Sequence, residues 1–191
     1  SRRRKIHDSE PPISIVVPIF SEDYNYLDTR LHDIMGQQYA ANFELVLVYV
    51  GADNDYFEEL NNMRLRYPNL VVTRIYEPRF PITVKLALNI GIKSAHYEHI
   101  VITTTDATPA SEQWLATMGT AFKRGDIVLG YTAIEPAAGL ANYLIRMSRM
   151  QISTYWIAGA ADGRTYRGSR HNFGFTKSLY FGNKGFTHLN M

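Results

Sequence analysis

A lone carboxylate directly after a buried strand is the clearest candidate for chemistry in this sequence. Asp106 follows an apolar run that ends at Thr104, hydroxyl side chains flank it, and Pro109 stiffens the exit of the loop. A carboxylate in that position can hold Mg²⁺ or Mn²⁺ against a diphosphate, because hard cations take oxygen ligands and leave positions open for phosphate. Aspartate is also a common N-cap, here of the helix that follows. The local sequence leaves both interpretations open.

Residue types exclude several other kinds of site. The loop at 18–22 has no glycine-rich turn and the sequence has no Walker A motif, so any nucleotide must be held by side chains and a metal. The sequence has no cysteine, which excludes disulfides, thiol nucleophiles and zinc–thiolate sites. The six histidines include no pair with the spacing of metal ligands on one helix face.

The elements that must position Asp106 alternate between strand and helix. Buried apolar runs predict strands at 13–19, 43–50, 70–75, 99–104 and 126–131. Helical spacing predicts one helix that is capped by 21–23 and ends at Gly36, and further helices at 53–66, 82–95 and 112–122. This alternation predicts an α/β domain whose mostly parallel sheet is covered on both faces. Ligands bind beyond the carboxyl ends of such strands, so we expect the site in the loops after Val17, Val50, Ile75 and Thr104.

Composition fits one globular domain. The chain has 191 residues, 46% of them hydrophobic, and a net charge of +2, which does not indicate a nucleic-acid partner. Basic residues gather at 2–5, either as a solvated tail or as a segment beside a membrane. We therefore expect a basic tail at 1–11 and one domain at 12–191. Without an apolar stretch long enough to span a bilayer, and with Ser1 at its start and Met191 at its end, the chain is expected to be a soluble fragment.

A further apolar segment at 139–160 contains Arg146 and Arg149. We interpret it as a helix that covers one edge of the sheet. The alternative is an interfacial helix that lies against a membrane with its arginines toward lipid phosphates.

The sequence resembles family 2 glycosyltransferases of the GT-A fold, most closely bacterial membrane-anchored members. The resemblance rests on five segments in the expected order, which together span nearly the whole chain: Ile13–Phe20, Tyr39–Val50, Lys85–Ala95, Thr105–Ser111 and Arg170–Leu179. It implies a three-layer, Rossmann-like GT-A domain that is truncated on its C-terminal side. It also implies a nucleoside diphosphate sugar as donor, a weakly held Mg²⁺ or Mn²⁺, and membrane attachment through segments outside this chain, at the cytoplasmic face of the inner membrane.

Carried over residue by residue, the resemblance implies an eroded donor site. Val50 stands where the family has a base-reading aspartate. Asp53 lies nearby, either as a helix cap or as a substitute for that aspartate. Thr104 stands at the first acid of the metal motif and only the second, Asp106, remains. Lys85 matches a lysine that can reach the diphosphate, or it is a solvated lysine on a helix face. The implied nucleotide-sugar-binding residues are Pro18, Phe20, Glu22, Val50, Lys85, Thr104, Thr105 and Asp106, with Asp106 as metal ligand.

On the acceptor side, the resemblance implies roles for Asn172 and for the neighbouring His171. The family's catalytic base belongs to an acidic pair that follows the segment matching Gly185–Phe186, and it is therefore expected beyond Met191. The family's reaction is sugar transfer to a lipid, glycan or polysaccharide acceptor, with inversion. The alternative is an inactive GT-A-like domain that binds or scaffolds partners in a membrane assembly. Either way, we expect weak donor binding and no turnover from this chain alone.

Overall fold

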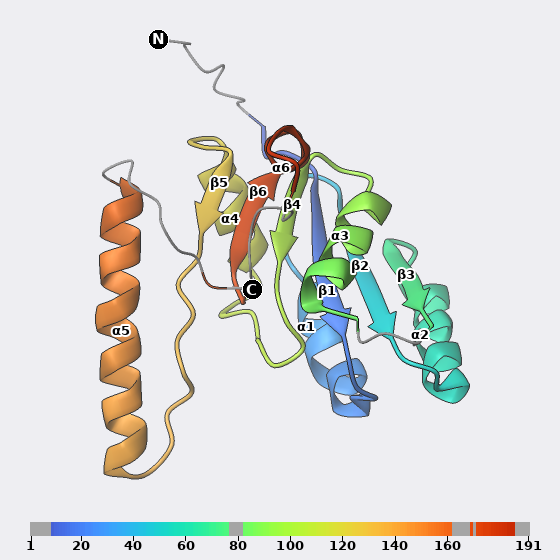
Figure 1. Cartoon of the computed structure of the whole chain (residues 1–191), viewed down its shortest axis with the longest axis horizontal. Helices are drawn as coiled ribbons and strands as arrows, with labels where there is room; N and C mark the ends of the chain where they lie inside the picture. Colours follow the sequence, from blue (N-terminus) through green and yellow to red (C-terminus); the bar gives the residue numbers. More distant parts are fainter. Residues whose placement is uncertain (1–8, 77–81, 162–168, 170, 186–191) are drawn as a thin grey trace.

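The computed structural model describes residues 9–76, 82–161, 169 and 171–185, so the basic residues 2–5 lie outside the described part (Figure 1). Within it, six strands form one sheet in the order β3-β2-β1-β4-β6-β5. β1 to β4 are parallel, and β6 runs antiparallel to both β4 and β5. The strands are β1 (Ile13–Ile19), β2 (Phe43–Val50), β3 (Leu70–Ile75), β4 (His99–Ile102), β5 (Ile127–Leu129) and β6 (Phe173–Thr176). The helices are η1 (Tyr26–Arg30), α1 (Leu31–Met35), α2 (Asn54–Arg66), α3 (Val84–Ser94), α4 (Trp114–Phe122), α5 (Leu140–Ala161) and α6 (Lys177–Gly182).

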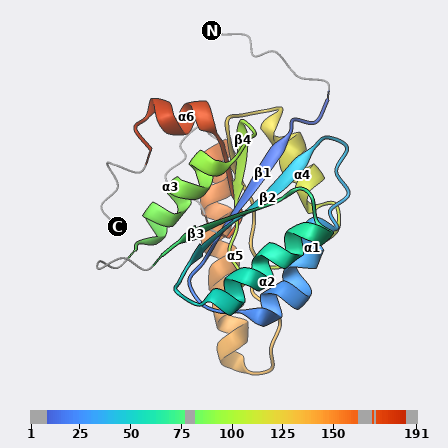
Figure 2. The same cartoon turned by 90° about the vertical axis from the view of Figure 1, so that its right-hand side faces the viewer.

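Helices cover both faces of the sheet, as Figure 2 shows. Ile15 and Val17 of β1 pack with buried residues of η1, α1, α2 and α4 on one face. Val16 packs with residues of α3 and α6 on the other. Every residue of β1 is buried, which explains why its sequence is apolar throughout instead of alternating. The predicted three-layer α/β domain with a mostly parallel sheet is therefore confirmed.

Two predicted strands are shorter than the sequence indicates. β4 ends at Ile102 and not at Thr104, and β5 covers only three residues of the predicted 126–131. The amide of Thr103 still donates to the carbonyl of Val16 at 3.2 Å, and the chain then turns away. Hydroxyl side chains can hydrogen-bond to nearby backbone groups and so compete with pairing between strands. A strand-like composition therefore overestimates the length of the paired segment.

The segment predicted as a helix at 139–160 forms α5, but α5 does not cover the sheet edge. Its large apolar side chains are mostly exposed, including Leu140 at 73% and Tyr155 at 72%, whereas Ser153 is buried. Most of the described apolar side chains of α5 therefore do not pack on the sheet. The alternative interfacial role remains a prediction. Among the described residues, no helix is both long enough and apolar enough to cross a membrane.

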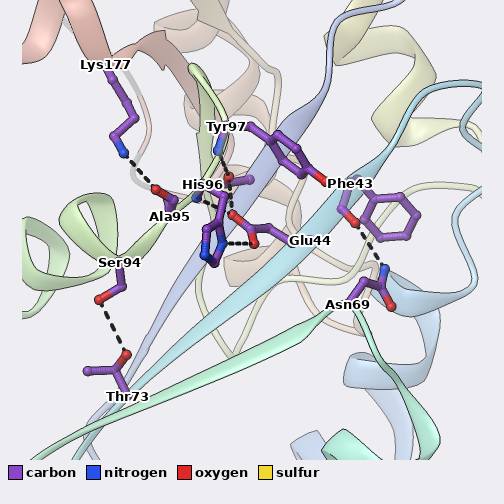
Figure 3. A network of polar contacts seen from close by, with 10 residues as sticks. Phe43, Glu44, Asn69, Thr73, Ser94, Ala95, His96, Tyr97 and Lys177 are labelled. Atoms are coloured by element: carbon purple, nitrogen blue, oxygen red, sulfur yellow. Dashed lines mark hydrogen bonds and ion pairs between the residues drawn. The ribbon is translucent and has the colours of Figure 1, made fainter.

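A buried carboxylate ties the amino ends of β1, β2 and β4 together, at the edge opposite the predicted site (Figure 3). One oxygen of Glu44 accepts from the Ser14 hydroxyl and the His96 amide, both at 2.6 Å. The other lies 2.7 Å from His96 Nδ1. The Ser14 hydroxyl in turn accepts from the Tyr97 amide at 3.1 Å. These bonds fix the loop between α3 and β4 against the sheet and so set where β4 begins.

Candidate functional site

The carboxyl ends of β1, β2, β3 and β4 meet at one edge of the sheet, because these four strands are parallel neighbours (Figure 1). The loops that leave this edge carry most of the residues that the sequence nominates. They divide into a group at the junction of β4 and β6 and a group around the ends of β1, β2 and β3.

The β4–β6 junction brings three of the predicted residues into contact. The Thr104 hydroxyl donates to Asp106 Oδ1 at 2.5 Å and lies 2.7 Å from His171 Nδ1. His171 Nδ1 is also 3.5 Å from Asp106 Oδ1. Since the hydroxyl has a single hydrogen, it accepts from the Nδ1–H of His171, which leaves Nε2 unprotonated in the neutral ring. We call Thr104, Asp106 and His171 the junction cluster.

Long-range pairing positions this cluster. β6 runs antiparallel to β4 with Phe173 opposite Ile102, so His171 arrives next to the residues that follow β4. The buried Thr103 hydroxyl donates to the carbonyl of His171 at 2.9 Å. Arg30 of η1 donates to the carbonyl of Thr105 at 2.9 Å, which anchors the other side of the loop. Thr105 therefore contributes to the site through its backbone carbonyl, which Arg30 holds in place.

The solvent exposure of the cluster favours an ion-binding role over a structural one. The Asp106 side chain is 69% exposed, whereas that of His171 is 17% exposed. The next helix, α4, begins only at Trp114, with Gln113 at its N-cap position. Asp106 therefore does not cap that helix, and the capping interpretation is wrong. The remaining interpretation is a ligand-binding carboxylate, which the Thr104 hydroxyl holds at the carboxyl end of β4.

At the end of β2, the core residue Tyr49 contacts the loops after β1 and β2 through its hydroxyl. The Tyr49 hydroxyl donates to Glu22 Oε1 at 2.5 Å and accepts from the Asp53 amide at 3.2 Å. Burial, with the hydrogen bond to Glu22, raises the pKa of Tyr49 to about 12. Glu22 is thus held in place by Tyr49, while Phe20 beside it is 44% exposed. The apolar pattern of a strand predicts which residues are buried, but it does not predict which loops their polar atoms contact. The sequence therefore gave no signal for the contact of Tyr49 with Glu22.

Two predicted donor-site residues lie in packed positions. Pro18 is buried in β1 opposite Val48 of β2. Val50 is half-buried and packs against the core on the α3 face. Neither side chain has a polar atom to present to a ligand, so both contribute only shape at this edge.

An arginine that the sequence analysis did not single out lies opposite Tyr49, in the register that pairs β3 with β2. Arg74 of β3 donates through Nε to the carbonyl of Gly51 at 3.0 Å and through Nη1 to Asn54 Oδ1 at 2.8 Å. Its guanidinium carbon lies 4.1 Å from the ring centre of Tyr76 and 4.9 Å from that of Phe57. Tyr76 is 66% exposed, so its ring forms an open flat surface backed by a cation. The sequence did contain a signal for this pair: Arg74 is a cation within an apolar strand, and the aromatic Tyr76 follows two residues later.

Asp53, which the sequence suggested either as a helix cap or as a substitute for the missing aspartate, is the N-cap of α2. Its Oδ1 accepts from the Tyr56 amide at 2.8 Å. We expect Asp53→Ala to lower the free energy of unfolding by about 1 kcal/mol, as for other lost caps, without changing nucleotide affinity. Urea unfolding and calorimetric titration of the same sample check both halves. The control is Asp55→Ala, an exposed aspartate in the first turn of the same helix. Loss of nucleotide binding in Asp53→Ala alone would assign Asp53 to the ligand.

Lys85 lies near the amino end of α3, close to the N-cap residue Thr83. It lines a cavity of about 390 Å³ between α3 and α6, together with Lys93, Lys184 and Asn89. The Tyr180 hydroxyl donates to Asn89 Oδ1 at 3.5 Å in the same region. The role of Lys85 toward the diphosphate, which the resemblance implies, stays a prediction.

Asn172 uses both ends of its amide in packing. Its oxygen accepts from the indole N–H of Trp114 at 3.2 Å, and its nitrogen donates to the carbonyl of Tyr131 at 3.2 Å. Asn172 also fills the space where a side chain on Gly130 would lie. It therefore links β6 to α4 and to the segment after β5, next to the cluster residue His171.

The junction cluster fits a divalent cation only in part. Among the described residues, no three His, Cys, Asp or Glu side chains come together as a metal site. The cluster offers one carboxylate, one hydroxyl and one imidazole, and Asp106 is open to solvent. Oxygen ligands that leave other coordination positions of the ion open suit Mg²⁺ or Mn²⁺ bound to phosphate. Without the phosphate oxygens, these few protein ligands would hold the ion only weakly. The donor chemistry is therefore compatible with a cation shared between Asp106 and a ligand.

The sequence matches no protein-family model and no curated protein. Among solved structures, the mannosyltransferase PcManGT from Pyrobaculum calidifontis, in complex with GDP-Man and Mn²⁺, is similar with a TM-score of 0.65 and 17% identity, over 93% of this chain and 48% of that chain. S. aureus TarS 1–349 in complex with UDP-GlcNAc is similar with a TM-score of 0.53 and 17% identity, over 67% of this chain and 36% of that chain. The same TarS segment in complex with UDP gives a TM-score of 0.54 and 16% identity, over 67% and 38%.

The chain thus spans about half the length of the mannosyltransferase and just over a third of the TarS 1–349 segment. At these identities the likeness concerns the fold, since one fold supports many functions. The order of strands, the helices on both faces and these structural neighbours agree: this chain has the GT-A fold of glycosyltransferases.

Proposed function

We propose that this chain is the donor-binding domain of a family 2 glycosyltransferase, and that it binds a nucleoside diphosphate sugar at the carboxyl ends of β1 to β4. The observation that carries the proposal is the exposed Asp106 carboxylate, held by Thr104 beside His171 at the end of β4 in a GT-A fold. The GDP-Man and Mn²⁺ bound to PcManGT support this choice of ligand and cation.

Each residue has a role that follows from its position. Asp106 would hold Mg²⁺ or Mn²⁺, and the ion would supply positive charge against the departing diphosphate. Thr104 orients the carboxylate through its hydroxyl. Tyr76, stacked on Arg74, offers its exposed ring to the nucleobase in place of the hydrogen bond that Val50 cannot make.

Sugar transfer needs a base that accepts the proton of the acceptor hydroxyl as the diphosphate departs. We assign this role to no residue within the described part of the chain. We therefore expect the chain to bind donor without turning it over, and the inverting transfer to a lipid, glycan or polysaccharide acceptor belongs to the whole protein.

The cytoplasmic face of a membrane is the proposed place of action. The support in this chain is α5, whose exposed apolar residues accompany Arg146 and Arg149 in a helix without an acidic residue. Apolar side chains beside cations are typical of helices that lie on anionic lipid surfaces.

The alternative function is a GT-A-like domain that has lost catalysis and binds or scaffolds a partner in a membrane assembly. Two positions favour it: Thr104 supplies no charge to a metal, and Val50, half-buried against the core, has no polar atom for a nucleobase. This alternative predicts a folded chain that binds no nucleotide.

Calorimetric titration with GDP, UDP, GDP-Man and UDP-GlcNAc, with and without Mn²⁺, tests the proposal. We expect Mn²⁺-dependent binding that Asp106→Ala weakens at least tenfold, or by about 1.4 kcal/mol. The matched control is Asp126→Ala, an exposed aspartate just before β5, which should bind like the unmodified chain. A folded chain that binds none of these compounds would refute the proposal and favour the scaffolding function.

A further inference from the structure

We propose that His171 is a protein ligand of the donor-site cation and takes the place of the acid that is missing at Thr104. This inference rests on the proposed function but names a different residue, on a different strand, from the metal ligand that the resemblance implies. Its ligand class is a divalent cation that accepts both oxygen and nitrogen, bound together with a diphosphate. The separation of His171 from Thr104 by 67 positions in sequence hides this pair from any local motif.

The spacing of the three donor atoms supports a shared ion. Asp106 Oδ1, Thr104 Oγ1 and His171 Nδ1 are separated by 2.5, 2.7 and 3.5 Å. Neighbouring ligands at about 2.1 Å from one octahedral ion lie about 3 Å apart, so these separations bracket the required value.

The histidine is held in place before any cation binds. Its side chain is only 17% exposed, its ring nitrogen is 2.7 Å from the Thr104 hydroxyl, and its carbonyl accepts from Thr103 at 2.9 Å. Pairing of β6 with β4 fixes the backbone on one side. Such preorganisation reduces the loss of side-chain entropy on binding, which helps a site with only one carboxylate.

Proton balance allows the ligation. A neutral imidazole always has one unprotonated nitrogen, and solvent exchanges the proton between the two. On cation binding, the ring carries its proton on Nε2 and presents Nδ1, while Thr104 continues to donate to Asp106. The step therefore needs neither a net proton nor an oxidant.

The presence of an imidazole has a consequence for the choice of metal. Mg²⁺ is bound almost entirely by oxygen, whereas imidazole nitrogen is a better ligand for transition metals. We expect the chain to prefer Mn²⁺ to Mg²⁺ when a diphosphate is present. His171→Asp replaces the imidazole by a second carboxylate, so it should reduce the ratio of Mn²⁺ affinity to Mg²⁺ affinity.

Electron paramagnetic resonance of Mn²⁺ bound to the chain tests the proposal, with inorganic pyrophosphate, with UDP and without either. Pyrophosphate contains no nitrogen, so any directly coordinated ¹⁴N seen by electron spin echo envelope modulation comes from the protein. We expect that signal in the unmodified chain and its loss in His171→Asn, with Mn²⁺ affinity about tenfold lower. Asparagine keeps a hydrogen-bonding group near Thr104, and circular dichroism checks that the variant is folded.

Two further variants separate ligation from a structural effect. Thr104→Asp, added to His171→Asn, should restore Mn²⁺ affinity without restoring the nitrogen signal. His96→Asn, which alters a histidine at the opposite edge of the sheet, should leave both affinity and signal unchanged.

The outcomes also separate this inference from the proposed function. Mn²⁺-dependent UDP binding without a nitrogen signal, and unaffected by His171→Asn, would leave the donor site standing and overturn the role of His171. A nitrogen signal with Mn²⁺ alone, but no binding of UDP or pyrophosphate, would support the ligation and refute the donor site. No bound Mn²⁺ under any condition would overturn both.

Discussion

Gly91→Val is expected to lower the free energy of unfolding by about 3 kcal/mol or more, and Gly91→Ala by about 1–2 kcal/mol. Gly91 lies buried on the face of α3 that packs on the sheet. A β-carbon there would lie 2.5 Å from Val16 Cγ1 and 2.8 Å from Val48 Cγ2. Both valines are buried in neighbouring strands and cannot move aside. Alanine regains about 0.5–1 kcal/mol of helix propensity, which partly offsets the overpacking.

Urea unfolding followed by circular dichroism measures this loss. The matched control is Gly182→Ala in α6, where an added β-carbon meets nothing within 4 Å, so that variant should be as stable as the unmodified chain or slightly more stable. Val16→Ala combined with Gly91→Ala should be less destabilising than the sum of the two changes, because each makes room for the other. An unchanged midpoint in Gly91→Val would mean that α3 does not pack on β1 and β2 as described.

Glu44→Leu is expected to cost about 2–4 kcal/mol of stability, although leucine is more apolar than glutamate. The Glu44 side chain is 7% exposed, and its oxygens accept from the Ser14 hydroxyl, the His96 amide and the His96 ring. Leucine would leave the buried Ser14 hydroxyl and the His96 amide without their acceptor, whereas the His96 ring, 70% exposed, can bond to water. The lost stability comes from the loop at His96 and Tyr97 that leads into β4, because this network holds that loop against the sheet.

The same urea experiment checks this prediction, with Glu98→Leu as control. Glu98 is exposed and accepts from the Ser178 amide at 2.9 Å, so its loss should cost about 1 kcal/mol or less. Ser14→Ala should cost less in the Glu44→Leu variant than in the unmodified chain, because the Ser14–Glu44 bond is already lost there and only the bond from the Tyr97 amide remains to be removed. A fully stable Glu44→Leu variant would show that the network contributes nothing to folding.

The sequence predicted the strands of the parallel half of the sheet well. β1, β2 and β3 have the predicted bounds, and the helices between them occur where apolar spacing and cap residues placed them. Burial on both faces leaves a continuous apolar run, which is a local and strong signal. The packing of α5 was predicted wrongly, because an apolar helix indicates a preference for burial and not which surface provides it.

For the candidate site, the sequence placed Asp106 after a strand but could not decide between a cap and a ligand. The structure decided, because α4 begins only at Trp114. Contacts of Tyr49 with Glu22 and of Arg74 with Gly51 were also beyond reach. They depend on how separate loops meet, which no local periodicity encodes.

What the sequence determined by itself is the alternation of strands and helices, and hence the edge at which a site forms, because both follow from burial patterns within short segments. Only the tertiary structure decided which residues share that site. The antiparallel return of β6 beside β4 brings His171 to Thr104 and Asp106. That pairing depends on the free energy of the whole sheet, so the junction cluster exists only in the folded chain.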